Sequence, residues 1–184
     1  TNYLSGRYNI NIGALDQYSY DGGGGFTGNL IGIGQEDATN LHVEATSEDY
    51  LTVKNPNSLE DGDYLLFAND NADATAWTTT ETPNGSTRRI AREWRVDETN
   101  EVGTVTLEID NSALPTPPES GLTWVLMVDS DGDFNTVDNS YPLTNIGGNI
   151  VNINGLDLNT GDYFTFALVK FETTGASFDF NNPF

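Results

Sequence analysis

The chain contains no cysteine and a single histidine in 184 residues. Without cysteine there is no disulfide framework and no metal site built on thiolates, although the absence says little about the cellular compartment. The single histidine, His42, and the lack of a serine in a nucleophile-elbow pattern leave an acyl-transfer triad without its parts. We expect His42 to be an ordinary strand residue rather than a metal ligand, and we predict that the protein is not an enzyme.

Positive charge is also scarce, because 28 Asp and Glu stand against 7 Lys and Arg and give a formal net charge of −21. Nucleic acids and anionic membranes are bound by basic surfaces, so neither is an expected partner. No apolar run approaches the roughly 18 residues that a membrane-spanning helix needs. The acidic balance favours solubility and cation binding, and bound divalent ions would relieve the self-repulsion of the folded chain.

Helical periodicity is missing as well, since no window carries an apolar stripe with helical spacing over three turns. Short apolar runs recur instead about every ten to fifteen residues, separated by Gly, Asn, Asp or Pro, as in sandwiches and barrels. We expect strands near residues 7–12, 29–34, 40–45, 50–54, 63–69, 89–97, 103–110, 123–129, 149–154 and 162–171. The pattern predicts an all-β fold, an antiparallel Greek-key β-sandwich of about nine to eleven strands.

A chain of this length is expected to form one domain, because all-β domains of this size are commonly single. We assign residues 13–171 to the sandwich and residues 1–12 to an N-terminal joint or edge strand. Residues 172–184 are interpreted as a C-terminal linker or docking tail. The sequence begins with Thr1 and shows no leader-like segment, so we expect it to be a processed or excised piece of a longer protein.

Two stretches, residues 59–64 and 158–163, have the form Leu-x-x-Gly-x-Tyr and run directly into an apolar strand. A tyrosine two positions after a glycine, at the entry to a strand, is typical of a tyrosine corner. Its hydroxyl bonds to upstream backbone and fixes the crossover between two sheets. The pattern predicts that Tyr64 and Tyr163 lie at sheet-to-sheet corners. The alternative is two ordinary strands that each follow a Gly-Asp turn.

The densest group of carboxylates directly follows an apolar run and consists of Asp129, Asp131, Asp133 and Asp138. Three acids at alternate positions around a glycine can wrap Ca²⁺, which takes six to eight oxygen ligands. The match to a helix-loop-helix calcium loop is incomplete, because Gly132 stands one position early and Ser140 occupies the place of the bidentate Glu. We predict bound Ca²⁺ here; the alternative is a solvated Asp/Gly turn without metal. A second, weaker cluster consists of Asn69, Asp70, Asn71 and Asp73.

Most of the positive charge is concentrated in residues 88–95. If this segment is one strand, Arg92 and Trp94 face the same side, toward the core. Arg92 must then pair with a carboxylate from an adjacent strand to be tolerated there. Two interpretations stay open for this segment. Its arginines neutralise an acidic neighbourhood while Trp94 lies in the core, or they form a clamp for an acidic or sugar ligand with Trp94 as a stacking platform.

Four separated blocks of sequence, in their order along the chain, resemble an uncharacterised β-sandwich domain repeated in very large secreted and surface proteins of Bacteroidetes-type bacteria. The blocks are residues 31–41, 89–96, 103–105 and 161–167. Residues 3–10 look like the joint between this domain and a preceding lectin-like jelly roll. The resemblance implies export, surface attachment, a multi-domain setting and an association with adhesion or gliding. No catalytic residue is established for that family, so none is transferred.

These observations favour a non-enzymatic, extracellular structural or adhesive module of a bacterial surface protein or filament, stabilised by calcium. Neighbouring modules or identical subunits would pair through edge strands, to which residues 1–12 and 178–184 of the chain could contribute. One alternative is a carbohydrate-binding module for surface glycans, with Trp77, Trp94 or Trp124 as the sugar platform. A second is a glycan-active enzyme, which would need two inward carboxylates in a cleft.

Overall fold

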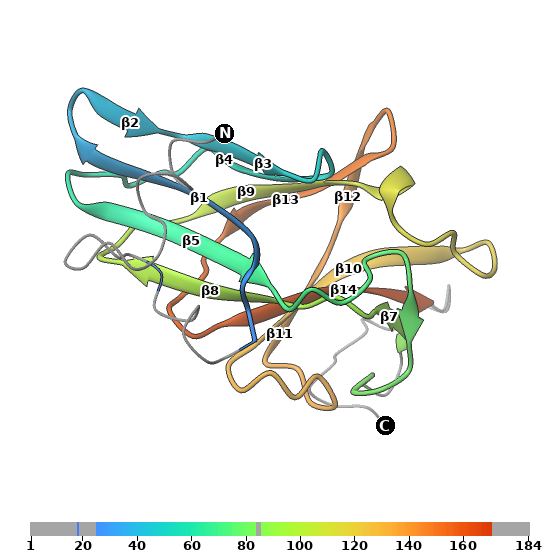
Figure 1. Cartoon of the computed structure of the whole chain (residues 1–184). Helices are drawn as coiled ribbons and strands as arrows, with labels where there is room; N and C mark the ends of the chain where they lie inside the picture. The colour runs from blue at the N-terminus through green and yellow to red at the C-terminus, as the bar shows by residue number, and fades with distance from the viewer. Residues whose placement is uncertain (1–17, 19–24, 84–85, 171–184) are drawn as a thin grey trace.

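The computed structural model describes residue 18 and residues 25–83 and 86–170 (Figure 1). These residues form fourteen strands and one short 3-10 helix, η2 (Asn111–Ala113). All pairings between the strands are antiparallel, and they divide the strands into two sheets. The prediction of an all-β sandwich is confirmed, although the described residues form fourteen strands rather than the expected nine to eleven. The Greek-key connections stay a prediction, and the expected segments 1–12 and 172–184 lie outside the described residues.

The larger sheet has nine strands, in the order β11-β10-β14-β8-β5-β1-β2, with β7 also paired to β14 and β6 paired to β7. Its strands are β1 (Gly28–Asp37), β2 (Asn40–His42), β5 (Asp63–Asn69), β6 (Trp77–Thr78), β7 (Ser86–Ile90), β8 (Trp94–Thr99), β10 (Leu122–Asp129), β11 (Asn139–Pro142) and β14 (Tyr163–Lys170).

Among the described residues, no helix is long and apolar enough to cross a membrane.

The smaller sheet has five strands in the order β12-β13-β9-β4-β3. Its strands are β3 (Glu44–Ser47), β4 (Leu51–Lys54), β9 (Val105–Asp110), β12 (Thr144–Gly147) and β13 (Ile150–Leu156). The chain passes from one sheet to the other six times, and two of these connections, β2 to β3 and β11 to β12, join an edge strand of one sheet to an edge strand of the other. Edge strands of both sheets therefore follow one another in the sequence on two sides of the sandwich.

The main hydrophobic core lies between the two sheets. Alternate residues of β9 and β14 supply it, including Leu107 from the smaller sheet and Phe164 and Phe166 from the larger. Trp94 stacks on Phe164 in this core, with ring centroids 5.2 Å apart and an interplanar angle of 5°. Burial of such side chains contributes about 1.5–3 kcal/mol each, so this layer supplies most of the driving force for folding.

The outer face of the larger sheet carries two further apolar clusters. Tyr18, Tyr64, Leu66 and Ala68 form one of them, and partly buried Leu30 packs against it. The other consists of Val125, Met127, Phe134, Val137, Ala167 and Val169, with partly buried Tyr163 packed against it. β5 and β10 are therefore apolar on both faces, because each is covered by the core on one side and by a cluster on the other. Their continuous apolar sequences have this cause.

Most expected strands are present within a few residues of their predicted bounds, but two expected strands differ and three further strands are present. The expected strand 40–45 is split at Val43, where the chain leaves β2 in one sheet and enters β3 in the other. The expected strand 89–97 is interrupted between β7 and β8. The short strands β6, β11 and β12 were not predicted, since their two to four residues carry too few apolar side chains to show alternation.

Candidate functional site

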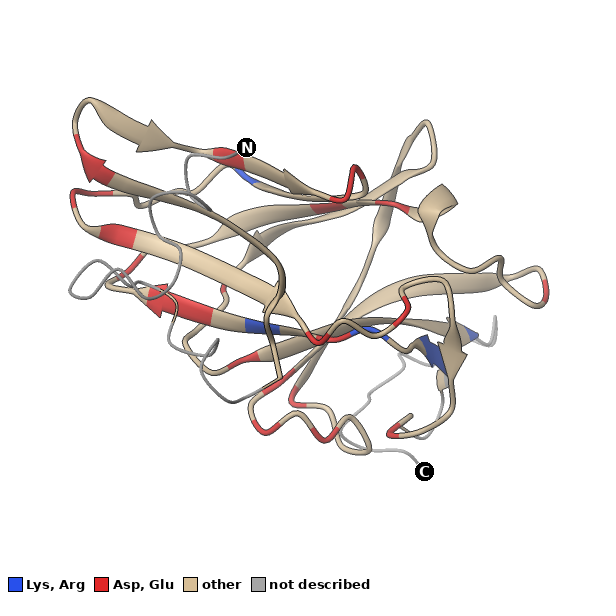
Figure 2. Cartoon of the chain, viewed as in Figure 1, with Lys and Arg blue, Asp and Glu red and all other residues tan. Residues whose placement is uncertain are grey.

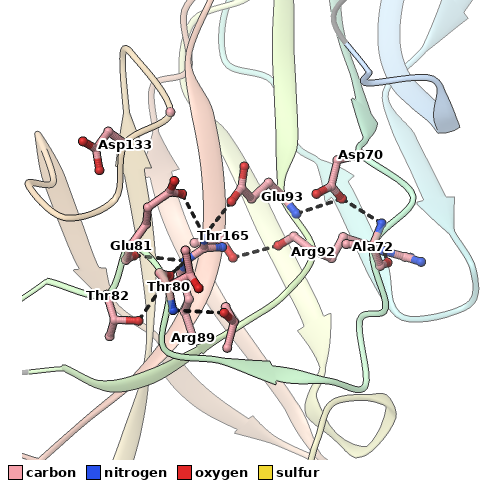
Figure 3. A network of polar contacts seen from close by, with 12 residues as sticks. Asp70, Ala72, Thr80, Glu81, Thr82, Arg89, Arg92, Glu93, Asp133 and Thr165 are labelled. Carbon is pink, nitrogen blue, oxygen red and sulfur yellow. Dashed lines mark hydrogen bonds and ion pairs between the residues drawn. The ribbon is translucent and has the colours of Figure 1, made fainter.

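The candidate site lies where β7 ends at Ile90 and β8 begins at Trp94 (Figure 3). The intervening backbone bonds to side chains and to a loop. The Thr165 hydroxyl donates to the carbonyl oxygen of Arg92 at 2.8 Å, and the backbone N–H of Glu93 donates to the Asp70 carboxylate at 3.3 Å. This bend corrects the prediction of a continuous strand through residues 89–97. It also directs the side chains on either side of it to different surroundings.

Arg89 is the most deeply buried cation of this segment, with 3% of its side chain exposed. Its Nε donates to the carbonyl oxygens of Thr80 and Glu81, each at 3.1 Å. One terminal nitrogen lies 2.7 Å from the Glu93 carboxylate and 3.1 Å from that of Glu81. The guanidinium also lies over the Phe134 ring, 5.1 Å from its centroid. Arg89 thereby joins β7, the loop before it and the outer-face cluster.

The carboxyl group of Glu93 is the ion-pair partner of Arg89. Its burial raises its pKa above the ordinary value, and the nearby carboxylates of Asp70 and Glu81 act in the same direction, while Arg89 opposes them. The guanidinium of Arg89 thus favours the charged form of a carboxyl group whose burial disfavours it. The arrangement is that of a structural ion pair whose members depend on each other.

Arg92 connects the two sheets. Its Nε donates to the carbonyl oxygen of Ala72 at 2.8 Å, and a terminal nitrogen donates to the Tyr50 hydroxyl at 2.8 Å and to the Glu48 carboxylate. The side chain is 12% exposed. Glu48 lies in the turn between β3 and β4, so the acidic partner comes from the opposite sheet rather than from an adjacent strand. The Tyr50 hydroxyl donates to Glu48 at 3.1 Å, and burial raises the pKa of Tyr50 to about 12.

The three tryptophans that were predicted as possible sugar platforms lie in two different environments. Trp94 is 1% exposed and lies in the main core, so it cannot present a face to a ligand. Trp77 and Trp124 stack on each other, with centroids 5.5 Å apart and an interplanar angle of 18°. Trp124 is buried and Trp77 is half-buried at the margin of the core. No spacing or motif predicted that these two indoles, 47 positions apart in the chain, would meet.

The two Leu-x-x-Gly-x-Tyr stretches fold in the same way, and an aspartate closes each turn. Asp63 accepts a hydrogen bond from the backbone N–H of Glu60 at 2.7 Å, and Asp162 accepts one from that of Asn159 at 2.8 Å. Gly62 and Gly161 have positive φ angles of 93° and 96° in these turns. The repeated Gly-Asp pair therefore specifies the turn, because glycine adopts this conformation without strain.

The two tyrosines stand at the start of β5 and β14, on the outer face of the larger sheet. The ring of Tyr64 lies against Gly34, where a β-carbon would come within 2.4 Å of it. Tyr163 meets Phe26 edge to face at 5.3 Å, and the Arg95 guanidinium lies 4.8 Å from its ring centroid. The hydroxyl-to-backbone bonds of a tyrosine corner stay a prediction.

The acidic loop after β10 is folded by its own carboxylates. Asp129 accepts the N–H groups of Asp131 and Gly132 at 2.9 and 2.8 Å, and Asp131 accepts that of Asp133 at 2.8 Å. Asp138 accepts from the backbone and hydroxyl of Ser130 at 3.0 and 2.6 Å. Backbone donors thus lower the pKa of Asp131, whereas burial raises that of Asp129.

Phe134 and Val137 extend from this acidic loop onto the outer face of β10 and β14, where both are buried. Within the described part of the chain, no group of three or more His, Asp or Glu side chains is arranged to hold a metal ion. The hydrogen bonds of its carboxylates and the burial of Phe134 and Val137 give the loop a structural role. The binding of Ca²⁺ to it stays a prediction.

The second acidic cluster is likewise held together by hydrogen bonds from backbone N–H groups to its own side chains. Asn69 is fully buried, and its side-chain oxygen accepts the N–H of Asn71 at 2.9 Å. Asp70 accepts the N–H of Ala72 at 3.0 Å, and Asp73 accepts the N–H and hydroxyl of Thr75 at 2.8 and 2.7 Å. The hydroxyl and N–H of Thr75 lower the pKa of Asp73. These four residues form successive turns that lead from β5 toward β6.

A family model described as a domain of unknown function (DUF8202) matches residues 13–162, which is most of the chain. The protein belongs to the DUF8202 family. No curated protein and no solved structure matches the chain. The resemblance of the DUF8202 domain to repeated modules of bacterial surface proteins stays a prediction.

Two features of the DUF8202 domain were missed in the sequence. Arg89 was not singled out, although its position beside Ile90 places it on the face opposite the core of a strand. Glu98, at the far end of β8, lies beside the carboxylates of Glu101, Asp157 and Asp63. Its burial raises its pKa to about 7, although its carboxylate accepts the N–H of Val102 at 2.9 Å. Neither feature has a local sequence signal, because each depends on residues brought together by the sheets.

Proposed function

We propose that the chain is a non-enzymatic, extracellular module of a bacterial surface protein or filament, with a structural and adhesive role. The observation that supports this proposal best is that the polar side chains of the candidate site and the acidic loop are engaged in structural contacts. Arg89, Arg92 and the carboxylates of the acidic loop are each engaged in bonds that hold loops and sheets together. A catalytic group needs an available functional atom facing a substrate. These groups instead serve to make the sandwich rigid.

A rigid module suits a tandem array because it transmits force and keeps its neighbours at a fixed distance. The Arg92 contacts to Glu48 and Tyr50 join the larger sheet to the β3–β4 turn of the smaller one. The acidic loop covers the outer face of the larger sheet with Phe134. If one sheet slid over the other, the Arg92 contacts to Glu48 and Tyr50 would break and the apolar faces of the sheets would become exposed. Both changes cost free energy, so the sandwich is expected to resist shear.

The side of the sandwich formed by β11 and β12 suits contact with a neighbouring module. Residues 139–156, which include both strands, contain no charged side chain, although the chain as a whole carries −21. Every residue of β12 is exposed, and Ile146 is among the exposed large apolar residues. Two strongly acidic modules repel each other least where both are neutral. The edge strands have only four residues each, so a covalent linker must supply most of the effective concentration for such contacts.

Antibody labelling of intact bacteria that make the full-length protein tests this placement on the cell. We expect an antibody raised against the folded domain to label unpermeabilised cells, and external protease to remove the label. Labelling that appears only after permeabilisation would contradict an extracellular role. A cytoplasmic marker labelled in the same cells controls for leakage.

A second candidate function, a carbohydrate-binding module, is favoured by one specific observation. Trp77 and Trp124 form a stacked pair whose outer member is half-buried. Indole faces are common sugar platforms because they bury the apolar C–H side of a pyranose ring. A glycan-active enzyme has less support. The pKa of Glu98 is near neutrality and the side chain lies among other acids, as a general acid would require, but its carboxylate is already engaged by a backbone N–H group.

A further inference from the structure

Only three large apolar side chains are exposed among the described residues, and they lie at two places in the fold. Leu41 on β2 is 54% exposed, and Val43, which links β2 to β3, is 46% exposed. Ile146 on β12 is 52% exposed. These places are on opposite sides of the sandwich, because β2 and β3 end the two sheets on one side and β11 and β12 end them on the other (Figure 1).

The hairpin formed by β12 and β13 projects beyond the core. All four residues of β12 are exposed, although successive residues of a strand face opposite sides, so neither face of β12 is covered. In the turn that follows, a β-carbon added at Gly147 or Gly148 would meet no atom within 4 Å. Ile146 therefore lies on a projection that a neighbouring molecule can reach.

The opposite side of the sandwich carries a second apolar patch, formed by Leu41 and Val43. The two residues are two positions apart on an extended segment, and such residues point to the same side. Burial lowers the pKa of His42 between them, so this side chain is neutral at pH 7. The patch thus has apolar side chains on its surface and no charge between them.

Both places lack charge in a chain that is strongly acidic overall. Residues 38–43 contain no Lys, Arg, Asp or Glu, and residues 139–156 contain none either. Figure 2 shows β2 and β12 without charged segments, while acids mark many other strand ends and loops. A basic partner would be attracted to those acids rather than to these two places. A partner that is itself acidic is repelled least here.

We propose that Ile146 of one copy of this chain packs against Leu41 and Val43 of the next copy, so that copies join head to tail. This contact rests on the proposed structural role of the module and adds the surface that the hairpin meets. A second copy is the partner that the observations select, because it is equally acidic and carries the matching apolar patch. One contact of this kind covers all three exposed apolar side chains.

The difference between the two patches determines the kind of assembly. A contact of Ile146 with Ile146 of another copy would be isologous and would leave Leu41 and Val43 exposed. A contact between unlike patches leaves one patch free at each end and can therefore repeat, as a filament or tandem array requires. Three side chains bury little area, so each contact is weak by itself and gains from repetition or covalent linkage.

Disulfide trapping tests this contact, since the chain has no cysteine of its own. Val43→Cys and Ile146→Cys, one of them carrying a tag that changes its mass, are mixed at about 1 mM, where a weak contact is populated, and oxidised with diamide. We expect the mixed dimer to exceed each homodimer at least about tenfold, against about twofold for random collision, because a disulfide needs Cα atoms within about 7 Å.

Two further variants control for chance collision. Thr116→Cys, at an exposed position between η2 and β10, should give only the random ratio when it is mixed with Val43→Cys. Leu41→Asp, added to the Val43→Cys chain, should return the ratio with Ile146→Cys to the random value, because it places a charge in the apolar contact. Circular dichroism of each variant establishes that it is folded.

The proposal is overturned if Val43→Cys and Ile146→Cys give the random ratio, or if Leu41→Asp leaves the excess of mixed dimer unchanged. A predominance of the Ile146→Cys homodimer would show an isologous contact and contradict the head-to-tail arrangement. Thiols that do not react with a maleimide in the separate variants would show that the chain itself covers the patches, which also contradicts the contact. Antibody labelling of intact cells does not depend on these outcomes, so failure of the contact and failure of the surface role are distinguishable.

Discussion

At the scale of single residues, the partners of each charge determine what that charge does in this molecule. Arg89 and Glu93 are buried together and depend on each other, whereas Arg88, one position earlier, has an indole for a neighbour and no carboxylate among the described residues. Alternation along β7 separates Arg88 from Arg89, because successive side chains of a strand face opposite sides, and the bend between β7 and β8 directs Arg92 to a third environment.

Replacement of Arg89 by alanine should destabilise the protein by about 3 kcal/mol, because it leaves the Glu93 carboxylate buried without its counter-ion. Lys170→Ala, which removes an exposed cation, should change stability by less than about 0.5 kcal/mol. Denaturant unfolding of both variants at pH 7 makes the comparison. Equal stability of Arg89→Ala and the wild type would show that the pair contributes nothing net.

Glu98 gives the sandwich a dependence on pH. Its pKa is about 7 in the folded state against 4.5 ordinarily, so between these values the folded protein holds a proton that the unfolded chain has released. Stability from this group is therefore full below about pH 4.5 and is lost as the pH rises through 7. Glu98→Gln keeps an acceptor for Val102 and cannot ionise. Because the carboxyl is only partly buried, we expect this variant to equal the wild type at pH 4 and to exceed it by about 1 kcal/mol at pH 8. Parallel unfolding free energies across this range would contradict the assignment.

The sequence predicted some residue environments and not others. Alternation along an assumed strand put Trp94 on the core-facing side, although a stacking platform stayed open as the alternative. The same alternation turned Arg92 toward the core and led us to expect a carboxylate partner for it. The identity of that carboxylate, Glu48, depends on a turn of the opposite sheet, 44 positions earlier. The environment of Arg89 depends on a loop, an outer-face cluster and a bend. None of these has a spacing that a single sequence reveals.

At the scale of elements, short turns closed by aspartate determine where strands begin and which faces are covered. The same Gly-Asp turn precedes β5 and β14, and the acidic loop after β10 positions Phe134 on the outer face. The tyrosines attracted attention in the sequence because they repeat, yet the aspartates beside them make the turn bonds. Composition predicted turns at these places correctly, since glycine and aspartate favour them for distinct physical reasons.

Thermal melting with calcium and with chelator tests the predicted cation in the acidic loop. A cation that binds only the folded loop raises the melting midpoint by mass action, and Asp131→Ala should remove that increase. Phe134→Ala should lower stability by about 3 kcal/mol whether calcium is present or not, because it removes a buried ring. Identical wild-type midpoints in calcium and chelator would leave a loop that is folded by its own hydrogen bonds alone.

At the scale of the whole molecule, two antiparallel sheets enclose one main core, while most of the acids lie outside it. Length, composition and the spacing of apolar runs were sufficient to predict this sandwich, because alternation and turn residues recur along the whole chain. They were insufficient to predict how the two sheets are ordered, since the pairing of β14 with three other strands joins distant segments. The position of the uncharged strands β11 and β12 at the edges of the two sheets emerges only from that order.

Attachment of bacteria to a surface, measured for cells that make the full-length protein with or without this domain, tests the central claim most directly. The deletion should keep the reading frame and leave the rest of the protein exported at the same level. We predict that attachment falls while no enzymatic activity of the cells toward glycans is lost. Unchanged attachment together with loss of a glycan-degrading activity would contradict a structural and adhesive role.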